Sequence, residues 1–229
     1  MKIICIIPAR GGSKGIPRKN IIDVNGKPLI AYSIEPAVKA MELGLVDRVI
    51  VSTDSEEIAN ISSKFGAEIP FLRPDDISGD KAKSVEFIEH ALGFYNSIGI
   101  NYDAVLLLQP TSPLRTLEDL INSLTLFVES KNDSLISAYE EEYINDLVIY
   151  KLSEDGKTSI PVNELHNKGV RRQEHGSLYV RNGCIYIASA ELIKKGYVIG
   201  EKPLMYIMEK NKSVNVDTFE DLELLRKLL

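Results

Sequence analysis

Hydrophobic and polar residues alternate along the first 130 positions in blocks of strand and helix length. Residues 3–7 and 104–108 are uninterrupted apolar runs, which are typical of strands buried on both faces. Residues 48–53, centred on Val49, Ile50 and Val51, predict another strand, and residues 69–72 a further short one. These four segments indicate the strands of one sheet.

Between the strands, apolar side chains recur at helical spacing. They predict one helix opened by Pro28 and stopped by Gly44, then helices over residues 56–65 and 83–98 and another from Thr116. Alternating strands and helices imply right-handed crossovers. We therefore expect an α/β fold with a Rossmann-like, mostly parallel sheet and helices on both faces.

The pattern changes after about residue 133. Residues 135–139 and 147–152, followed by a turn at 154–157, resemble antiparallel strands rather than crossovers. The stretch 159–178 is polar and weakly periodic, which suggests an arm that leaves the sheet. Strands are expected again at 182–188 and 204–208, and Thr218 caps a final helix. The chain thus predicts a single domain, residues 1–229, with an insertion at about 140–178.

Composition limits the classes of function. The chain has 229 residues, 44% of them hydrophobic, and a net charge of −6. Its pI near 5.3 argues against a nucleic-acid-binding face. The sequence has neither an apolar run long enough to cross a membrane nor the apolar core of a signal peptide. Cys5 and Cys184 lie in apolar runs and are expected to be buried thiols, so a cytoplasmic protein without a membrane partner is predicted.

The loop after the first strand concentrates positive charge and glycine. Residues 8–20 read Pro-Ala-Arg-Gly-Gly-Ser-Lys-Gly-Ile-Pro-Arg-Lys-Asn. Glycine lets backbone amides turn toward an anion, and Arg10 and Lys14 can bind phosphate oxygens. A plain surface turn is the alternative, while the spacing excludes both a P-loop and a dinucleotide fingerprint. In an acidic chain, so local a basic cluster indicates a nucleoside triphosphate ligand.

This loop resembles the signature of the CMP-sialic acid synthetase family, which are cytidylyltransferases. The resemblance implies a nucleotidyltransferase-type fold, CTP as one substrate, and a nonulosonic acid sugar whose anomeric hydroxyl attacks the α-phosphorus while pyrophosphate leaves. It assigns Arg10 and Lys14 to catalysis. The implied nucleotide-binding residues are Ala9, Arg10, Gly11, Gly12, Ser13, Lys14, Asn20, Arg73, Ala82 and Ser84.

The segment 109–115, Gln-Pro-Thr-Ser-Pro-Leu-Arg, matches the same family residue for residue. In that family it lines the sugar site, and an insertion like the one at 140–178 forms a dimerisation arm, so a homodimer is expected. The implied sugar-binding residues are Gln109, Thr111, Ser112, Arg115, Arg172, Gln173, Asn182 and Tyr186. Arg172 suits the sugar carboxylate, because a guanidinium can bind it with two parallel hydrogen bonds.

A metal site is predicted at residues 213–217. Alternation places Asn215 and Asp217 on one face of this segment and the intervening valines on the other. Two side-chain oxygens beside a triphosphate suit Mg²⁺, with Mn²⁺ as a second choice, because Mg²⁺ uses few protein ligands. The family usually has two aspartates here, so Asp217 is the principal expected ligand and joins the catalytic residues.

Two alternatives remain open from the sequence. The enzyme could activate another acidic sugar, such as a Kdo-like octulosonate, because residues 140–145 depart from the family pattern near the sugar. A non-catalytic nucleotide-binding protein is the other alternative, since Asn215 replaces a carboxylate. Pyrophosphate release separates the two classes.

Overall fold

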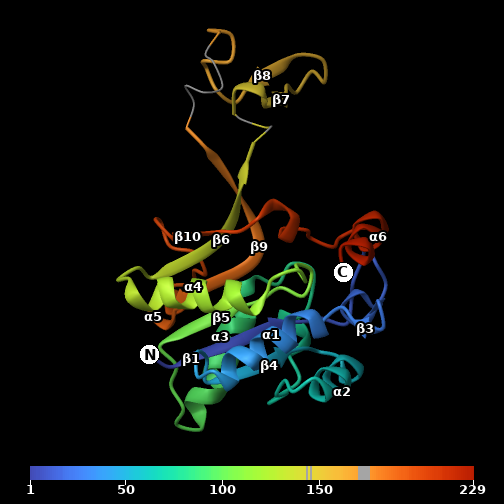
Figure 1. The fold of residues 1–229 in the computed structure, drawn as a ribbon, viewed down its shortest axis with the longest axis vertical. Coiled ribbons are helices and arrows are strands. Elements are labelled where there is room, and N and C mark those ends of the chain that lie inside the picture. Colours follow the sequence, from blue (N-terminus) through green and yellow to red (C-terminus); the bar gives the residue numbers. More distant parts are fainter. Residues whose placement is uncertain (143, 145, 170–175) are drawn as a thin grey trace.

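The computed structural model describes residues 1–142, 144, 146–169 and 176–229. Figure 1 shows a layered body of sheet and helices from which a narrow arm extends. Among the described residues, six strands form the central sheet in the order β10-β6-β9-β5-β1-β4. Their bounds are β1 Ile3–Pro8, β4 Arg48–Ser52, β5 Ala104–Leu107, β6 Ser134–Glu141, β9 Leu178–Ser189 and β10 Leu204–Ile207.

The sheet is mostly parallel, as the sequence predicts. β1 pairs in parallel with β4 and β5, and β10 with β6, whereas β9 runs antiparallel to both of its neighbours. The reason is the route of the chain. After β6 the chain enters the arm and returns directly alongside β6 as β9. No crossover helix carries it back to the starting edge of the sheet, so β9 runs opposite to β6.

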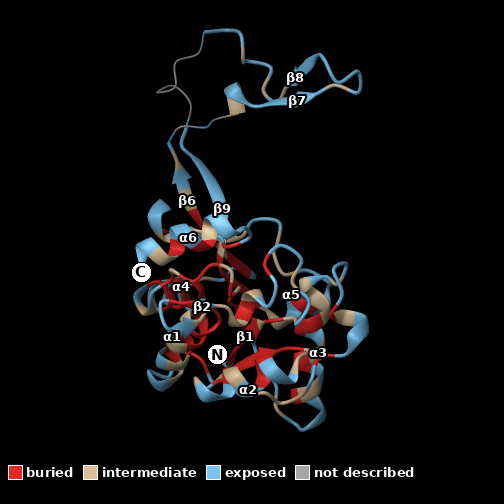
Figure 2. Ribbon diagram, turned by 90° about the vertical axis from the view of Figure 1, so that its right-hand side faces the viewer, coloured by how far each residue is buried: buried red, intermediate tan, exposed pale blue. Residues whose placement is uncertain are grey.

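Helices cover both faces of the sheet. Their bounds are α1 Ala31–Glu42, α2 Glu56–Lys64, α3 Ser84–Ser97, α4 Leu117–Glu129, α5 Ala190–Lys194 and α6 Phe219–Leu228. Buried side chains of α1, α2 and α4 form one core with the sheet, and those of α3 and α5 form a second core on its other face. Figure 2 shows this burial concentrated in the layered body. Each fully buried isoleucine in these cores contributes about 1.5–3 kcal/mol.

A third, smaller core packs the loop after β1 and the hairpin at residues 23–28 against the C-terminal helix α6. It joins Ile16, Val24 and Leu29 to Val216 and to two leucines of α6. α6 begins with a capping box in which the Asp221 carboxylate accepts hydrogen bonds from the amides of Asp217 and Thr218, at 3.0 and 2.8 Å. The residues before α6 are therefore held against the N-terminal loop.

Some element predictions were wrong. Residues 69–72 form no strand, and only Glu68 makes a bridge, to Ile50; Pro70 lacks the amide donor that a strand needs. The first helix begins at Ala31 rather than Pro28. Pro28 instead ends a hairpin, β2 (Asp23–Val24) and β3 (Lys27–Pro28), because Asn25 and Gly26 adopt φ of 51° and 86°.

The predicted strand at 147–152 is shorter than expected. A 3₁₀ turn, Asp146–Val148, precedes β7, Tyr150–Leu152, which pairs antiparallel with β8, Ser159–Pro161. This pair lies at the tip of the arm, beyond the ends of β6 and β9 (Figures 1 and 2). The expected antiparallel arm is present, with its base in the long β6–β9 ribbon.

Candidate active site

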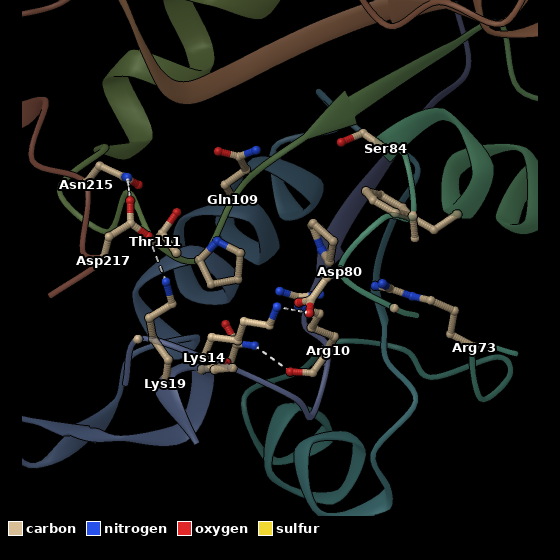
Figure 3. Close-up of a pocket in the computed structure, with 18 residues that line it drawn as sticks. Arg10, Lys14, Lys19, Arg73, Asp80, Ser84, Gln109, Thr111, Asn215 and Asp217 are labelled. Atoms are coloured by element: carbon tan, nitrogen blue, oxygen red, sulfur yellow. Dashed lines mark hydrogen bonds and ion pairs between the residues drawn. The ribbon is translucent and has the colours of Figure 1, made fainter. Parts of the chain in front are cut away.

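A cavity of about 680 Å³ opens at the carboxyl ends of β1 and β5. Ligands of open α/β sheets bind at this edge because the loops that follow the strands converge there. Figure 3 shows its side chains pointing toward one another from several elements. The predicted residues that line it are Arg10, Ser13, Lys14, Asn20, Arg73, Ala82, Ser84, Gln109, Thr111, Asn215 and Asp217.

The first loop presents its cations to this cavity. Asn20 is buried and donates from Nδ2 to the Arg10 carbonyl at 3.0 Å, which fixes the backbone from which the Arg10 side chain projects. The Gly11 amide donates to Asp54 at 2.7 Å and so faces the end of β4 rather than the cavity. The side chains of Arg10 and Lys14, rather than the Gly11 amide, therefore carry the positive potential of the loop into the site.

Arg10 and Lys14 share one counter-ion. Asp80 lies 2.8 Å from Arg10 and 2.5 Å from Lys14, each measured from nitrogen to carboxylate oxygen. The Lys14 hydrogen bond and the neighbouring positive charges hold the pKa of Asp80 below its usual range. The carboxylate is thus ionised at neutral pH and places one negative charge against these two cations.

Arg73 is fixed on the same side of the cavity as Arg10, at the end away from Asp217 (Figure 3). Its Nε donates to Ser52 Oγ at 3.0 Å, it also donates to the Ser52 carbonyl, and its guanidinium lies 4.7 Å from the centre of the Phe87 ring. Burial lowers the pKa of Arg73 to about 10, so it remains charged at neutral pH. Ala82, which precedes α3, and Ser84, its first residue, also line the cavity.

The other end of the cavity contains Asp217, Asn215 and Lys19. Lys19 Nζ lies 2.9 Å from Asp217 and donates to the Val216 carbonyl at 3.0 Å, while Asn215 donates to the second oxygen of Asp217. Val216 is buried between the two exposed side chains. The predicted alternation is confirmed, although residues 213–217 are not paired as a strand.

Gly15 permits this meeting of segments. A Cβ at position 15 would lie 2.6 Å from the Asp217 carbonyl oxygen, which is closer than a real Cβ approaches a heavy atom. Only glycine allows the two backbones to approach so closely. The absence of a side chain at Gly15 therefore allows the basic loop to lie directly against the predicted metal ligand Asp217.

A second glycine makes room for Gln109. A Cβ on Gly183, whose φ is 76°, would lie 2.9 Å from Gln109 Oε1. The Gln109 carbonyl accepts a hydrogen bond from Arg115, so the backbone of Gln109 is fixed. Gln109 and Thr111 are the predicted sugar-binding residues that reach the cavity.

Several predicted site residues lie elsewhere. Arg115 is buried and donates to the Cys184 carbonyl, the Ser33 hydroxyl and the Gln109 carbonyl, so it supports the site from beneath. Asn182 is likewise buried and binds Ser137 and Ser213. The remaining residues outside the cavity lining are Ala9, Gly11, Gly12, Ser112 and Tyr186. Arg172 and Gln173 lie outside the described residues.

Sequence reasoning did not assign Lys19, Asp80 or Phe87 to the site. Lys19 belongs to the basic run and could have been included on charge alone. Asp80 and Phe87 give no signal of their own, because a lone aspartate and a helical phenylalanine are common in any chain. Their roles follow from contacts with Lys14 and Arg73 that only the fold creates.

Asp217 and Asn215 fit a magnesium ion that is held mainly by a substrate. They offer one carboxylate and one amide oxygen from the same side of an extended segment, and Mg²⁺ accepts few protein ligands when phosphates and water supply the rest. The described residues contain no group of three or more His, Cys, Asp or Glu side chains that could hold a metal without a substrate.

Comparison with known proteins assigns the family. The cytidylyltransferase family matches residues 4–229. The chain belongs to the cytidylyltransferase family. It is 36% identical over 224 residues to the pseudaminic acid cytidylyltransferase of Campylobacter jejuni, covering 97% of this chain and 94% of the relative. It is 35% identical to the N-acylneuraminate cytidylyltransferase of Escherichia coli, with 97% of this chain matching 51% of that longer protein.

A solved structure shows the same cytidylyltransferase fold. CMP:2-keto-3-deoxy-manno-octonic acid synthetase complexed with CTP superposes with a TM-score of 0.71 at 18% identity, covering 100% of this chain and 98% of the other. The expected family, α/β fold and enzyme class are confirmed. Within the described residues, no helix has the length and apolar character needed to cross a bilayer.

Proposed function

We propose that this cytidylyltransferase transfers CMP from CTP to the anomeric hydroxyl of a nonulosonic acid and releases pyrophosphate. The observation that carries the proposal is that Arg10, Lys14 and Lys19 line one cavity together with Asp217. Three cations suit the charge of a triphosphate, and relatives act on pseudaminic and N-acylneuraminic acids. We also propose a cytoplasmic location, which agrees with two buried free cysteines.

The residues suggest how the reaction is promoted. Arg73, Ala82 and Ser84 would hold the nucleoside at one end of the cavity, and Arg10 and Lys14 would bind the leaving phosphates. Fixed cations stabilise charge that develops on a leaving group because they need no reorganisation during reaction. The lining within the described residues contains neither His nor Cys, which agrees with direct attack by the sugar hydroxyl on phosphorus.

Asp217, assisted by Asn215, would hold Mg²⁺ or Mn²⁺. When bound, the ion would neutralise phosphate charge and orient the triphosphate. Lys19 pairs with Asp217 at 2.9 Å and would contribute its charge to the same phosphates once Asp217 engages the ion. The protein's part is then to bring one carboxylate and one cation to the same phosphate group.

The defining experiment is pyrophosphate release from CTP and Mg²⁺ with a panel of sugars. We expect release with N-acetylneuraminic, legionaminic or pseudaminic acid, and mass spectrometry should find the matching CMP-sugar. UTP serves as the nucleotide control. Release with a Kdo-like octulosonate instead would establish the alternative acidic sugar. CTP binding without release for any sugar would indicate a non-catalytic nucleotide-binding protein.

Replacing Gln109 by alanine is expected to separate the two substrates. Gln109 lies away from Arg10 and Arg73 (Figure 3), and Gly183 leaves room for its side chain. Its loss should raise the KM for the sugar about tenfold or more, since a lost hydrogen bond to a charged group, here the sugar carboxylate, costs roughly 1.5–3 kcal/mol. CTP affinity by calorimetry should stay near that of the wild type. An equal loss of both ligands would contradict the assignment of Gln109 to the sugar.

We also propose that the arm forms a homodimer. Its described part exposes apolar side chains that the subunit itself leaves uncovered, including Leu152 at 70% and Ile160 at 54% exposure. A two-stranded β pair is marginal in water unless another surface covers it. A second copy of the arm is a matching apolar surface, and the predicted contact of Arg172 with a sugar carboxylate belongs to this same insertion.

Charging the arm is expected to produce monomers. The double change Leu152→Asp and Ile160→Asp should lower the sedimentation mass by half and reduce activity at nanomolar protein. Leu43→Asp is the matched control, because Leu43 is an exposed leucine that follows α1, remote from the arm, and its exposure of 59% lies between those of Ile160 and Leu152. A wild-type protein that sediments as a fully active monomer would refute the dimer.

A further inference from the structure

Asp80 occupies an unusual position for an acidic residue. It follows the 3₁₀ turn Asp75–Ile77 and precedes α3, yet its carboxylate reaches across the cavity to the loop after β1. One oxygen lies 2.8 Å from Arg10 and the other 2.5 Å from Lys14. Figure 3 shows Asp80 beside both cations. Two oxygens on two separate cations imitate the way a phosphate group would bind there.

The folding of the segment does not require this carboxylate. The backbone near it is held by other contacts: Ser78 donates to the Pro74 carbonyl, the Ala82 amide donates to Gly79, and the Lys83 amide donates to Glu86. Among the described residues, Arg10 and Lys14 are the partners of the Asp80 side chain. Its contacts are therefore directed at the site.

The ion pairs are open to exchange. The side chains of Asp80 and Lys14 are 43% and 80% exposed, so water and salt screen their attraction. A single carboxylate carries one negative charge, whereas a triphosphate or pyrophosphate carries several. A polyphosphate can therefore take Arg10 and Lys14 from Asp80, whereas a free anion of one charge has no advantage over the tethered carboxylate.

We propose that Asp80 is an internal competitor for the phosphate-binding cations and sets the selectivity of the site for polyphosphates. Before CTP binds, the carboxylate occupies Arg10 and Lys14 against weakly charged anions. After transfer, it returns to them and opposes retention of pyrophosphate. The inference rests on the proposed function, since it assigns these two cations to the leaving phosphates of CTP.

The test is the affinity of inorganic pyrophosphate for Asp80→Asn, measured by calorimetry. Removing the competing charge should lower the Kd about three- to tenfold, a range set by the modest strength of exposed ion pairs. Inhibition of turnover by added pyrophosphate should become stronger to the same degree. Cytidine, which has no phosphate, should bind both proteins alike, as judged by ligand-detected NMR.

Two variants complete the design. Asp75→Asn removes the same charge from an exposed residue of the same segment and should leave pyrophosphate affinity unchanged. Asp80→Glu keeps the carboxylate and should stay near wild type. Unchanged pyrophosphate binding in Asp80→Asn would overturn the inference, because Asp80 would then not compete for the cations. Weaker binding would overturn it too, because Asp80 would then support the bound pyrophosphate. A wild-type protein that binds no CTP would instead overturn the proposed function, and this inference with it.

Discussion

Replacing Arg10 by alanine is expected to lower turnover by about two to three orders of magnitude, as the removal of one preorganised donor does in other enzymes. Asn20 holds the Arg10 carbonyl at 3.0 Å and Asp80 pairs with the guanidinium, so the cation already lies in the cavity. Loss of this cation should weaken stabilisation of the leaving phosphates. Pyrophosphate release at saturating CTP and sugar measures the effect.

Stability should change little in this variant. Arg10 pairs with the exposed Asp80, and substitutions at exposed ion pairs usually alter unfolding free energy by less than about 0.5 kcal/mol. Arg18→Ala is the matched control, because Arg18 belongs to the same basic run but pairs with Glu57 outside the cavity. Near-normal turnover in Arg10→Ala, or an equal loss in Arg18→Ala, would remove Arg10 from catalysis.

The second large effect is expected at the proposed metal ligands. Asp217→Ala should nearly abolish turnover at any Mg²⁺ concentration, because Asp217 is the one carboxylate that residues 213–217 present to the cavity. Asn215→Asp should act in the opposite direction. A second negative charge near a divalent cation is attractive, and in a solvated site we expect the Mg²⁺ concentration for half-maximal rate to fall on the order of three- to tenfold.

The contact between Asn215 and Asp217 supplies an independent readout. The amide of Asn215 donates to the Asp217 carboxylate. An aspartate at position 215 would therefore place two negative charges side by side, and their repulsion would be relieved when a cation binds between them. Added Mg²⁺ should therefore raise the melting temperature of Asn215→Asp more than that of the wild type. An unchanged metal dependence of the rate in Asn215→Asp would mean that residue 215 is no metal ligand.

Much of the fold follows from local patterns. The apolar run before Pro8 and the apolar run at 104–108 predict the central strands because few other structures bury a short segment on both faces. Thr116 and Thr218 predict helix starts because their hydroxyls accept from amides three residues on. The antiparallel direction of β9 was less accessible, since it depends on where the arm returns to the sheet.

Site residues were predictable where charged residues and glycines occur together in the sequence. They were less predictable where a side chain supports the site through contacts with distant segments. Arg10 and Lys14 stand out among small residues, whereas Arg115 resembles a loop cation and is in fact enclosed by three acceptors. Sequence cannot distinguish an arginine that meets a substrate from one that satisfies buried carbonyls. Nor can it pair Lys19 with Asp217, 198 positions apart.

That separation has a consequence for biosynthesis. The basic loop leaves the ribosome nearly 200 residues before the carboxylate it faces, and Gly15 meets the Asp217 carbonyl only when the two segments have joined. Closing so long a loop is a late event in folding, because its entropy must be offset by contacts already made. A nascent chain that has folded β1, β4 and β5 but has not yet released residue 217 therefore still lacks one side of the cavity.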